Sequence, residues 1–526
     1  MFLAQHSNVN ESSIDEMSSD LIETLQFIAT PIYGKRKKKK KKKKHKNKPI
    51  WYTSECESLK RSLNRAEREY RKNPLNRGLQ EKLYSAKKKF KQVCKAAERG
   101  VRNKLTNQLL GIEAKNPTEF WKLVNSMKKW GKNETKTENS IPPEEWLSYF
   151  QDLLGKKPET SAHILKELQE LENEPAFTEM DFRISPNEIE KAINRLNKKS
   201  SPGPDGILCK HLFSCKKQLL PMLELFCNKL FTHASQPKTQ SLNFLKPAYK
   251  KGENWNPDNY RGIAVGSALG KIFELILLTR LEKRIEMTHP ISPNQIGFKK
   301  GHRTGDHIFV LKSIIDKIIK SEKKKLYVAF IDFRKAYDTV NRSLLLLRIQ
   351  RLGIKGLFYR NIKTIYNSIS YLVKVHGGHL NAIPSYCGLK QGGILSSMLF
   401  NLYIDHIKDI FDESCDPIRL LKDPLSHMLY ADDLILLSTS EKGLKRCLSK
   451  LAEFCDKWQL EINISKSKIM IFNPSGRLTK GIRFEYKEKP MEIVQSYCYL
   501  GIDFSSSGTF TLAKNNLMEK AQKAMY

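Results

Sequence analysis

Two adjacent carboxylates, Asp432 and Asp433, lie between two short apolar runs in the segment 427–438. Ionised carboxylates are costly to bury unless they are paired or bound to a metal ion. The apolar runs predict two short strands, and the Asp-Asp pair between them predicts a tight hairpin. A hairpin tip that holds two acids could bind a divalent cation, although an acidic turn is more often only a solvated loop.

A third acid, Asp332, follows the run Leu326–Ile331, which is rich in β-branched and aromatic residues and predicts a buried strand. Asp332 would stand at the C-terminal end of this strand, a usual position for site residues; the alternative is a helix cap. Asp338 fits a cap or a surface acid better. Three acids from two strand ends could hold two Mg²⁺ ions, with Mn²⁺ as a substitute, for a displacement at phosphorus.

The elements around these acids suit a nucleotide triphosphate, which needs cations and close backbone contacts. The stretches 244–252 and 259–264 predict a basic strand-turn-strand unit. Gly388–Gly393 is a glycine-rich turn that opens an apolar helix predicted over Ile394–Ile410. Backbone can approach a ligand closely at such a turn, and a helix N-terminus favours phosphate.

The composition favours a nucleic-acid partner. The 526 residues carry a formal net charge of +36, which indicates a polyanion. No apolar run approaches the roughly 20 residues that span a bilayer, and no secretory signal pattern is present, so we expect an intracellular protein without a membrane partner. The ten cysteines form no Cys-x-x-Cys pair, which argues against a zinc site or a disulfide framework.

An unbroken run of ten basic residues, Lys35–Lys44, follows an acidic, serine-rich segment (1–33) that we expect to be mostly disordered. The run could be a nuclear address or a nucleic-acid tether, and the alternative is a low-complexity tract with neither role. We therefore expect a nuclear location, with the cytoplasm as the alternative.

Eight short motifs follow one another along the chain. They are Gly203-Pro-Asp-Gly206, Tyr260-Arg-Gly262, Gln295-Ile-Gly-Phe298, Asp332-Phe-Arg-Lys-Ala-Tyr-Asp338, Gly388-Leu-Lys-Gln-Gly392, Tyr430-Ala-Asp-Asp433, Asn463-Ile-Ser-Lys466 and Tyr499-Leu-Gly501. Their order over about residues 190–505 resembles the reverse transcriptase of non-LTR (LINE-type) retrotransposons. The resemblance implies an α+β right-hand polymerase with fingers, a palm whose antiparallel sheet has helices on one face, and a partial thumb.

The same resemblance suggests how the chain is divided. The expected segments are 1–48, acidic disordered segment and polybasic run; 49–131, basic helical extension; 132–189, linker and helices leading into the polymerase; 190–325, fingers; 326–505, palm with primer grip; and 506–526, start of the thumb. Such elements also encode an endonuclease and a longer C-terminal region. We expect this chain to lack the endonuclease and to be truncated at its C-terminus.

The resemblance assigns roles to individual residues. Asp332, Asp432 and Asp433 match the metal-binding triad, and the backbone carbonyl of Phe333 would complete the coordination. Tyr337 matches the aromatic gate that excludes a ribose 2′-OH; the alternative is an ordinary core tyrosine.

Further residues match the groups that bind substrates. The set comprises Arg261, with Lys250 and Lys251 as helpers, on the triphosphate; Gln391 and Gly392 at the incoming nucleotide; Lys466, with Lys468 as its rival, as the proton donor to pyrophosphate; and Tyr499, Leu500 and Gly501 as the primer grip. The chain departs from the family at Gly393-Ile394, where Cys-Pro is common, and at Ser397, where Pro is common. These changes could loosen the glycine-rich turn.

The expected function is RNA-directed DNA synthesis, in which dNTPs are added to the 3′-OH of a DNA primer on an RNA template. The sequence names no protein partner. One alternative is a decayed element fragment that binds RNA without catalysis, and another is an RNA-dependent RNA polymerase, from which Tyr337 would distinguish it.

Overall fold

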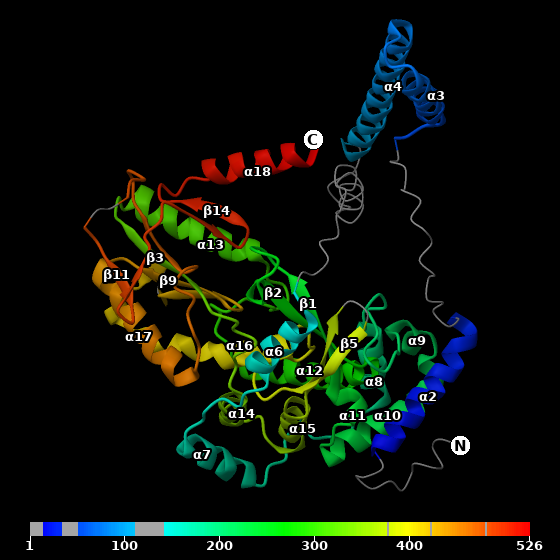
Figure 1. Cartoon of the computed structure of the whole chain (residues 1–526). Coiled ribbons are helices and arrows are strands. Elements are labelled where there is room, and N and C mark those ends of the chain that lie inside the picture. The colour runs from blue at the N-terminus through cyan, green and yellow to red at the C-terminus, as the bar shows by residue number, and fades with distance from the viewer. Residues whose placement is uncertain are drawn as a thin grey trace. The chain divides into compact units, whose positions relative to one another are not determined.

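The computed structural model describes residues 14–33, 51–110, 141–375, 378–420, 423–478 and 481–525 (Figure 1). The chain forms two compact units, one of residues 1–35 and 139–513 and one of residues 36–138 and 514–526. Every residue expected in the site belongs to the first unit.

The described residues form the following helices and strands, each kind given in chain order. The helices are α2 (Ile14–Tyr33), α3 (Ser54–Lys72), α4 (Arg77–Leu110), α6 (Pro143–Leu154), α7 (Ala162–Asn173), α8 (Pro186–Arg195), α9 (Cys209–Ser214), α10 (Lys216–His233), α11 (Lys238–Ser241), α12 (Ala268–Thr288), α13 (Thr304–Ile315), α14 (Arg342–Arg351), α15 (Gly356–Asn367), α16 (Ser396–Ile404), α17 (Glu441–Trp458) and α18 (Thr511–Met525). The strands are β1 (Leu242–Tyr249), β2 (Tyr260–Val265), β3 (Leu326–Asp332), β4 (Ser370–Val375), β5 (Gly378–Pro384), β6 (Ile418–Leu420), β7 (Asp423–Leu425), β8 (His427–Tyr430), β9 (Asp433–Ser438), β10 (Lys468–Phe472), β11 (Phe484–Tyr486), β12 (Lys489–Met491), β13 (Ser496–Tyr499) and β14 (Ile502–Ser505).

A four-stranded antiparallel sheet in the order β10-β3-β9-β8 carries the predicted acids. The central strand β3 pairs with β9 from Tyr327 opposite Ser438 to Asp332 opposite Asp433. The predicted buried strand and the predicted acidic hairpin therefore occupy adjacent positions in one sheet. The expected α+β fold with an antiparallel sheet is confirmed.

Helices cover both faces of this sheet, which corrects the expectation of helices on one face only. Tyr327 and Ala329 of β3 belong to the core that includes α17, whereas Val328 and Phe330 belong to a second core built with α13. Figure 1 shows α13 and α17 on opposite sides of β3 and β9. The physical reason lies in β3 itself, because its uninterrupted apolar run has no polar face to offer to solvent.

A second four-stranded sheet, in the order β2-β1-β4-β5, joins residues expected in different segments. β1 and β2 form the antiparallel basic hairpin predicted from the sequence, and β1 also pairs in parallel with β4. β4 and β5 lie within 326–505, and α13 lies within 190–325 although it packs on the sheet of β3. Elements from both sides of the expected boundary at 325/326 therefore pack together.

Residues 14–33 form a helix, which corrects the expectation that residues 1–33 are mostly disordered. Ile14, Met17, Leu21 and Leu25 are buried and belong to the main core. Their spacing of three and four residues places them on one side of the helix. Glu16, Ser19, Asp20 and Glu23 are exposed, so averaging over the composition of the segment hides its buried apolar side.

Polar contacts hold α2 against the start of α11, more than 200 residues further along the chain. The Ser18 and Thr239 hydroxyls are 2.8 Å apart, and the backbone N–H of Lys238 donates to Asp15 Oδ1 at 2.8 Å. The helix is therefore part of the first unit rather than an appendage to it.

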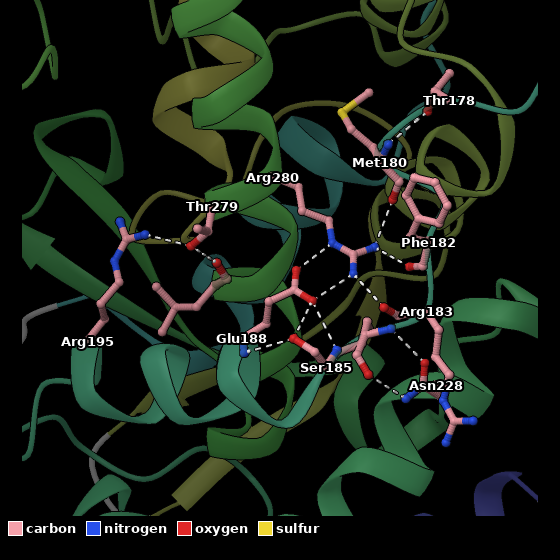
Figure 2. Close-up of polar contacts among 12 residues, drawn as sticks. Thr178, Met180, Phe182, Arg183, Ser185, Glu188, Arg195, Asn228, Thr279 and Arg280 are labelled. Atoms are coloured by element: carbon pink, nitrogen blue, oxygen red, sulfur yellow. Dashed lines mark hydrogen bonds and ion pairs between the residues drawn. The ribbon is translucent and has the colours of Figure 1, made fainter.

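A buried arginine on α12 ties the segment before α8 to the rest of the unit (Figure 2). The Arg280 guanidinium binds the Glu188 carboxylate through Nε at 2.7 Å and Nη2 at 3.0 Å. It also donates to the carbonyls of Met180 and Phe182 at 2.8 Å and of Arg183 at 3.3 Å. Because one side chain satisfies three carbonyls and one carboxylate, this part of the fold depends on Arg280.

The second unit contains the helical hairpin of α3 and α4. Leu63, Ala66 and Leu83 are buried between the two helices, and Tyr70 and Phe90 pack against them. The two helices lie within the segment 49–131, for which a basic helical extension was expected. The polybasic run Lys35–Lys44 lies outside the described residues.

Within the described ranges, no helix combines the length and the apolar character that crossing a membrane requires.

Candidate active site

Acids that are a hundred residues apart in the sequence meet at the ends of two neighbouring strands. Asp332 is the last residue of β3, and its Cα partner across the sheet is Asp433, the first residue of β9. Asp432 and Ala431 form the turn between β8 and β9, and Ala431 has a φ of +58°. Residues directly opposite in an antiparallel pair share one face, so the sheet brings the acids together.

Asp332 is fixed by its backbone on the side opposite the hairpin. Its N–H donates to Ser467 Oγ at 3.0 Å, and its carbonyl accepts from the N–H of Asn463 at 2.8 Å. Asn341 caps the helix that follows, α14, through bonds from two backbone N–H groups. Asp332 is therefore not a helix cap, and the alternative weighed from the sequence is excluded.

A cavity of about 900 Å³ opens beside these carboxylates. Its wall includes Lys250, Arg261, Asp332, Phe333, Tyr337, Gln391, Gly392, Asp432 and Lys466. Asp433, Lys251 and the three residues expected in the primer grip lie outside this wall. Apart from Asp433 and Lys251, the residues expected at the metal ions and at the nucleotide thus converge on one space.

The carboxylates repel one another in this setting. Desolvation, together with the negative charges of Asp432 and Asp332, raises the pKa of Asp433 to about 6, although its side chain still reaches solvent. Burial raises the pKa of Asp432 against the opposing charges of Arg261 and Lys250. A bound cation would relieve this repulsion, because it favours the ionised form of every carboxyl around it.

Lys250 and Lys466 bring positive charge to the same acids. Burial and the neighbouring charge of Arg261 lower the pKa of Lys250. Lys466 Nζ lies 3.9 Å from Asp332 Oδ2. Its rival Lys468 is bound to Glu492 at 2.7 Å and does not line the cavity. The geometry therefore favours Lys466 over Lys468 for any role near the reacting phosphates.

The glycine-rich turn is attached to the walls on either side of it. The side-chain amide of Gln391 donates to Asp338 Oδ2 at 2.8 Å, and the backbone carbonyl of Gln391 accepts from the N–H of Ala264 at 2.8 Å. Burial raises the pKa of Asp338 to about 7. Asp338 is thus neither a helix cap nor a surface acid, which corrects the expectation; it holds the side chain of Gln391. A contact across 53 residues leaves no local signal in the sequence.

A buried ion pair holds the turn where the chain departs from the family pattern. Lys390 is bound to Glu274 of α12, and both side chains are almost fully buried. The other carboxylate oxygen of Glu274 accepts from the N–H of Ile394 at 3.3 Å. A proline at position 394 would lack that N–H. The structure therefore shows a compensating contact at the position where the sequence suggested a looser turn.

Tyr337 stands in the cavity wall with a fixed ring. It stacks on Phe400 of α16 at 4.5 Å between centroids, with 14° between the planes. Its carbonyl accepts from the N–H of Leu389 at 2.7 Å. Burial raises the pKa of the Tyr337 hydroxyl well above its usual value, so the group is neutral at physiological pH. These contacts hold the ring in one position in the cavity wall, where it also packs against the core.

Tyr499, Leu500 and Gly501 form the turn of the β13–β14 hairpin. Leu500 and Gly501 both have positive φ, as the tightest hairpin turns require. Tyr497 of the same hairpin stacks on Phe330 of β3 at 4.3 Å. Burial and the negative charges of Asp332 and Asp433 raise the pKa of Tyr497 to about 12. The hairpin therefore lies next to the acids but outside the cavity.

Helix α6 contributes to the cavity, which the sequence did not indicate. Tyr149 and Phe150 of α6 line the wall. The Tyr149 hydroxyl donates to Asp258 Oδ1 at 3.2 Å, and Lys335 Nζ donates to the same oxygen at 2.7 Å. Asp258 lies between β1 and β2, and Lys335 follows β3. Asp258 thus connects α6, the basic hairpin and the segment after β3 at the cavity wall.

His307 of α13 contacts the β13–β14 hairpin, and its burial leads to a prediction on acid stability. Its Nδ1 lies 3.1 Å from the Tyr499 hydroxyl, and burial lowers its pKa to about 4. A histidine that folds in its neutral form stabilises the protein fully above pH 6.5, and this contribution is lost as the pH falls through about 4. We expect His307→Gln to remove about 3 kcal/mol of the pH dependence of unfolding over this window.

Urea unfolding of both proteins at pH 7, 5 and 4 measures the difference, with the exposed His379→Gln as the control. Equal pH dependence in the wild type and His307→Gln would contradict the prediction.

The arrangement defines a class of protein. Carboxylates at the ends of adjacent strands, cations opposite them and a glycine-rich turn are the parts that phosphoryl transfer uses. On a strongly basic chain, an antiparallel sheet with such a site is the palm of a nucleic-acid polymerase.

Comparison with known proteins gives the family. Residues 248–504 match the family described as reverse transcriptase (RNA-dependent DNA polymerase). That domain therefore belongs to the reverse transcriptase family, as the order of its motifs implied.

Three relatives show the extent of the similarity. A probable RNA-directed DNA polymerase from transposon BS of Drosophila melanogaster is 26% identical over 301 residues, covering 55% of this chain and 32% of that protein. A Pol polyprotein from the retrotransposable element R2 of Popillia japonica is 30% identical, covering 62% and 45%. The polymerase from mobile element jockey of Drosophila melanogaster is 24% identical, covering 64% and 37%. The chain spans between about a third and a half of these relatives.

Reverse transcriptases generally depend on divalent cations. Among the described residues, no group of three or more His, Cys, Asp or Glu side chains is arranged as a complete metal site. Asp332 and Asp432 nevertheless supply oxygen ligands within one cavity. Mg²⁺ needs only one or two carboxylates when substrate phosphates complete its shell. The residues present therefore fit such an ion together with a bound nucleotide.

Proposed function

We propose that this protein is an RNA-directed DNA polymerase of a non-LTR retrotransposon. One observation carries the proposal: Asp332 and Asp432, from adjacent strand ends, line the same cavity as Arg261 and Gln391. The substrates would be dNTPs, a DNA primer and an RNA template, as the names of the relatives suggest. Contacts to the nucleic acid would go mainly to phosphate and sugar, because a polymerase must accept every sequence.

Each residue has a place in the proposed reaction. The primer 3′-OH attacks the α-phosphate of the dNTP, and pyrophosphate leaves. Two Mg²⁺ ions, held by Asp332, Asp432, Asp433 and the carbonyl of Phe333, would stabilise the charge on the attacking and leaving oxygens. Arg261 and Lys250 bind the triphosphate, and Gln391 and Gly392 position the nucleotide. Lys466 gives a proton to pyrophosphate, and the Tyr499–Gly501 hairpin holds the primer end.

Primer extension tests the proposal directly. The purified chain, poly(rA)/oligo(dT) and dTTP should give elongated primers with Mg²⁺, and chelation by EDTA should abolish the elongation. Added Mg²⁺ in excess of the chelator should restore it. Without extension in Mg²⁺ or Mn²⁺, on this and a second primed RNA, the polymerase proposal fails and RNA binding alone is left.

The gate at Tyr337 predicts a change of sugar selectivity. Tyr337→Ala opens space beside the ribose 2′ position, so the preference for dTTP over UTP should fall by about 10- to 200-fold. Competing single-nucleotide incorporations measure this ratio. Tyr386→Ala, a half-exposed tyrosine outside the cavity wall, is the control and should keep the wild-type preference. An unchanged ratio in Tyr337→Ala would count against the gate.

A further inference from the structure

The turn that presents Asp432 is strained. Ala431, immediately before it, has a φ of +58°, in the left-handed region that residues other than glycine rarely adopt. Such conformations cost of the order of 1–3 kcal/mol and persist only where surrounding groups enforce them. The residues that enforce this one therefore control where the Asp432 carboxylate lies.

Gln295 encloses the backbone of Ala431 with both ends of its amide. Gln295 Oε1 accepts from the Ala431 N–H at 3.0 Å, and Gln295 Nε2 donates to the Ala431 carbonyl at 3.3 Å. The same Oε1 accepts from the N–H of Gly297 at 2.8 Å. The Gln295 side chain is completely buried, so water does not compete for these bonds.

The segment that carries Gln295 is itself attached to the hairpin and to α16. Leu429 of β8 donates its N–H to the carbonyl of Asn294 at 2.9 Å and accepts from the N–H of Ile296 at 3.1 Å. Asn401 of α16 donates to the Gly297 carbonyl at 2.7 Å. Gly297 packs so closely that a Cβ there would overlap the backbone nitrogen of Ala431. The segment that carries Gln295 is thus held firmly against the β8–β9 hairpin and α16.

We propose that Gln295 is a positioning residue that sets the metal-binding geometry of Asp432 by holding Ala431 in its left-handed conformation. The inference rests on the proposed function. Gln295 touches neither the nucleotide cavity nor the reacting atoms; it acts through the backbone of the neighbouring turn. Groups that orient metal ligands in this way are worth about 10- to 100-fold in metal affinity or activity.

Gln295→Met tests the proposal, because methionine keeps the length and volume of the side chain but makes none of the three hydrogen bonds. We expect the Mg²⁺ concentration for half-maximal dTTP incorporation to rise about tenfold or more, with a smaller effect on the KM for dTTP. Gln350→Met, at a buried glutamine on α14 outside the cavity wall, is the matched control and should keep the wild-type Mg²⁺ requirement.

Relief of the strain provides a second test. Glycine adopts a positive φ freely, so adding Ala431→Gly to Gln295→Met should restore part of the lost Mg²⁺ affinity. A merely structural role of Gln295 would not produce this rescue. If Gln295→Met does not fold, Gln295→Glu keeps the shape and replaces the donor to the Ala431 carbonyl with an acceptor, and it should weaken Mg²⁺ in the same direction.

The outcomes separate this proposal from the proposed function. A folded Gln295→Met with the Mg²⁺ requirement of the wild type overturns the positioning role while the polymerase stands. An inactive wild type overturns the polymerase. The positioning of Asp432 is then measured by the rise in unfolding temperature when Mn²⁺ is added, which should be smaller in Gln295→Met than in the wild type. An equal rise in both proteins overturns the positioning role in that case too.

Discussion

Asp432→Asn should reduce dTTP incorporation by about 10³-fold or more, because a neutral amide no longer binds the cation that stabilises several kcal/mol of transition-state charge. The same change should stabilise the metal-free protein at pH 8. It removes one of the mutually repelling carboxylates that, with burial, raise the pKa of Asp433 to about 6. Activity and stability thus move in opposite directions, which a general loss of structure cannot produce.

Single-turnover primer extension and thermal unfolding in EDTA measure the two effects. Asp409→Asn, at an exposed acid bound to His406 away from the cavity, is the matched control and should leave incorporation unchanged. Incorporation by Asp432→Asn within tenfold of the wild type would contradict the assignment of this carboxylate.

Arg280→Ala should have the largest effect on folding, at about 3 kcal/mol of lost unfolding free energy. The substitution leaves the Glu188 carboxylate without its partner and three carbonyls without their donor. Breaking a buried pair from one side typically costs about 3–5 kcal/mol. Because the Glu188 side chain is partly exposed, water offsets some of that cost, and the lower end applies.

Urea unfolding gives the measurement, and Arg183→Ala supplies the comparison. Arg183 is also bound to a glutamate, Glu224, but its side chain is mostly exposed. Exposed pairs contribute about 0–1 kcal/mol, so Arg183→Ala should remain close to the wild type. Similar losses in the two variants would show that burial does not distinguish them.

The local patterns of the sequence were sufficient to predict β3 and the β8–β9 hairpin. The apolar run before Asp332 predicts β3, and the acids between two short apolar runs predict the β8–β9 turn. Both signals depend on residues that are neighbours in the chain. The expectation of helices on one face was wrong, although the run of β3 without polar positions already indicated two buried faces.

Contacts between distant segments could not be read in the same way. Asp338 looks like any polar residue near a helix start until the fold places Gln391 against it. The motif that contains Gln295 was visible, but the hydrogen bond between the Gln295 side chain and Ala431 joins residues 136 positions apart. Tyr149 and Phe150 reach the cavity only because α6 packs beside the basic hairpin. These features depend on tertiary packing, which no local window contains.

The docking of α2 affects how the chain is made. Ser18 leaves the ribosome 221 residues before Thr239, the residue that it contacts. At about 5–20 residues per second, this separation corresponds to about 10–45 s of synthesis. During that interval the apolar side of α2 lacks the surface that α11 later provides, so chaperones have a binding target on the nascent chain. The apolar side of α2 is thus unable to pack against α11 until the segment that contains Thr239 has been synthesised.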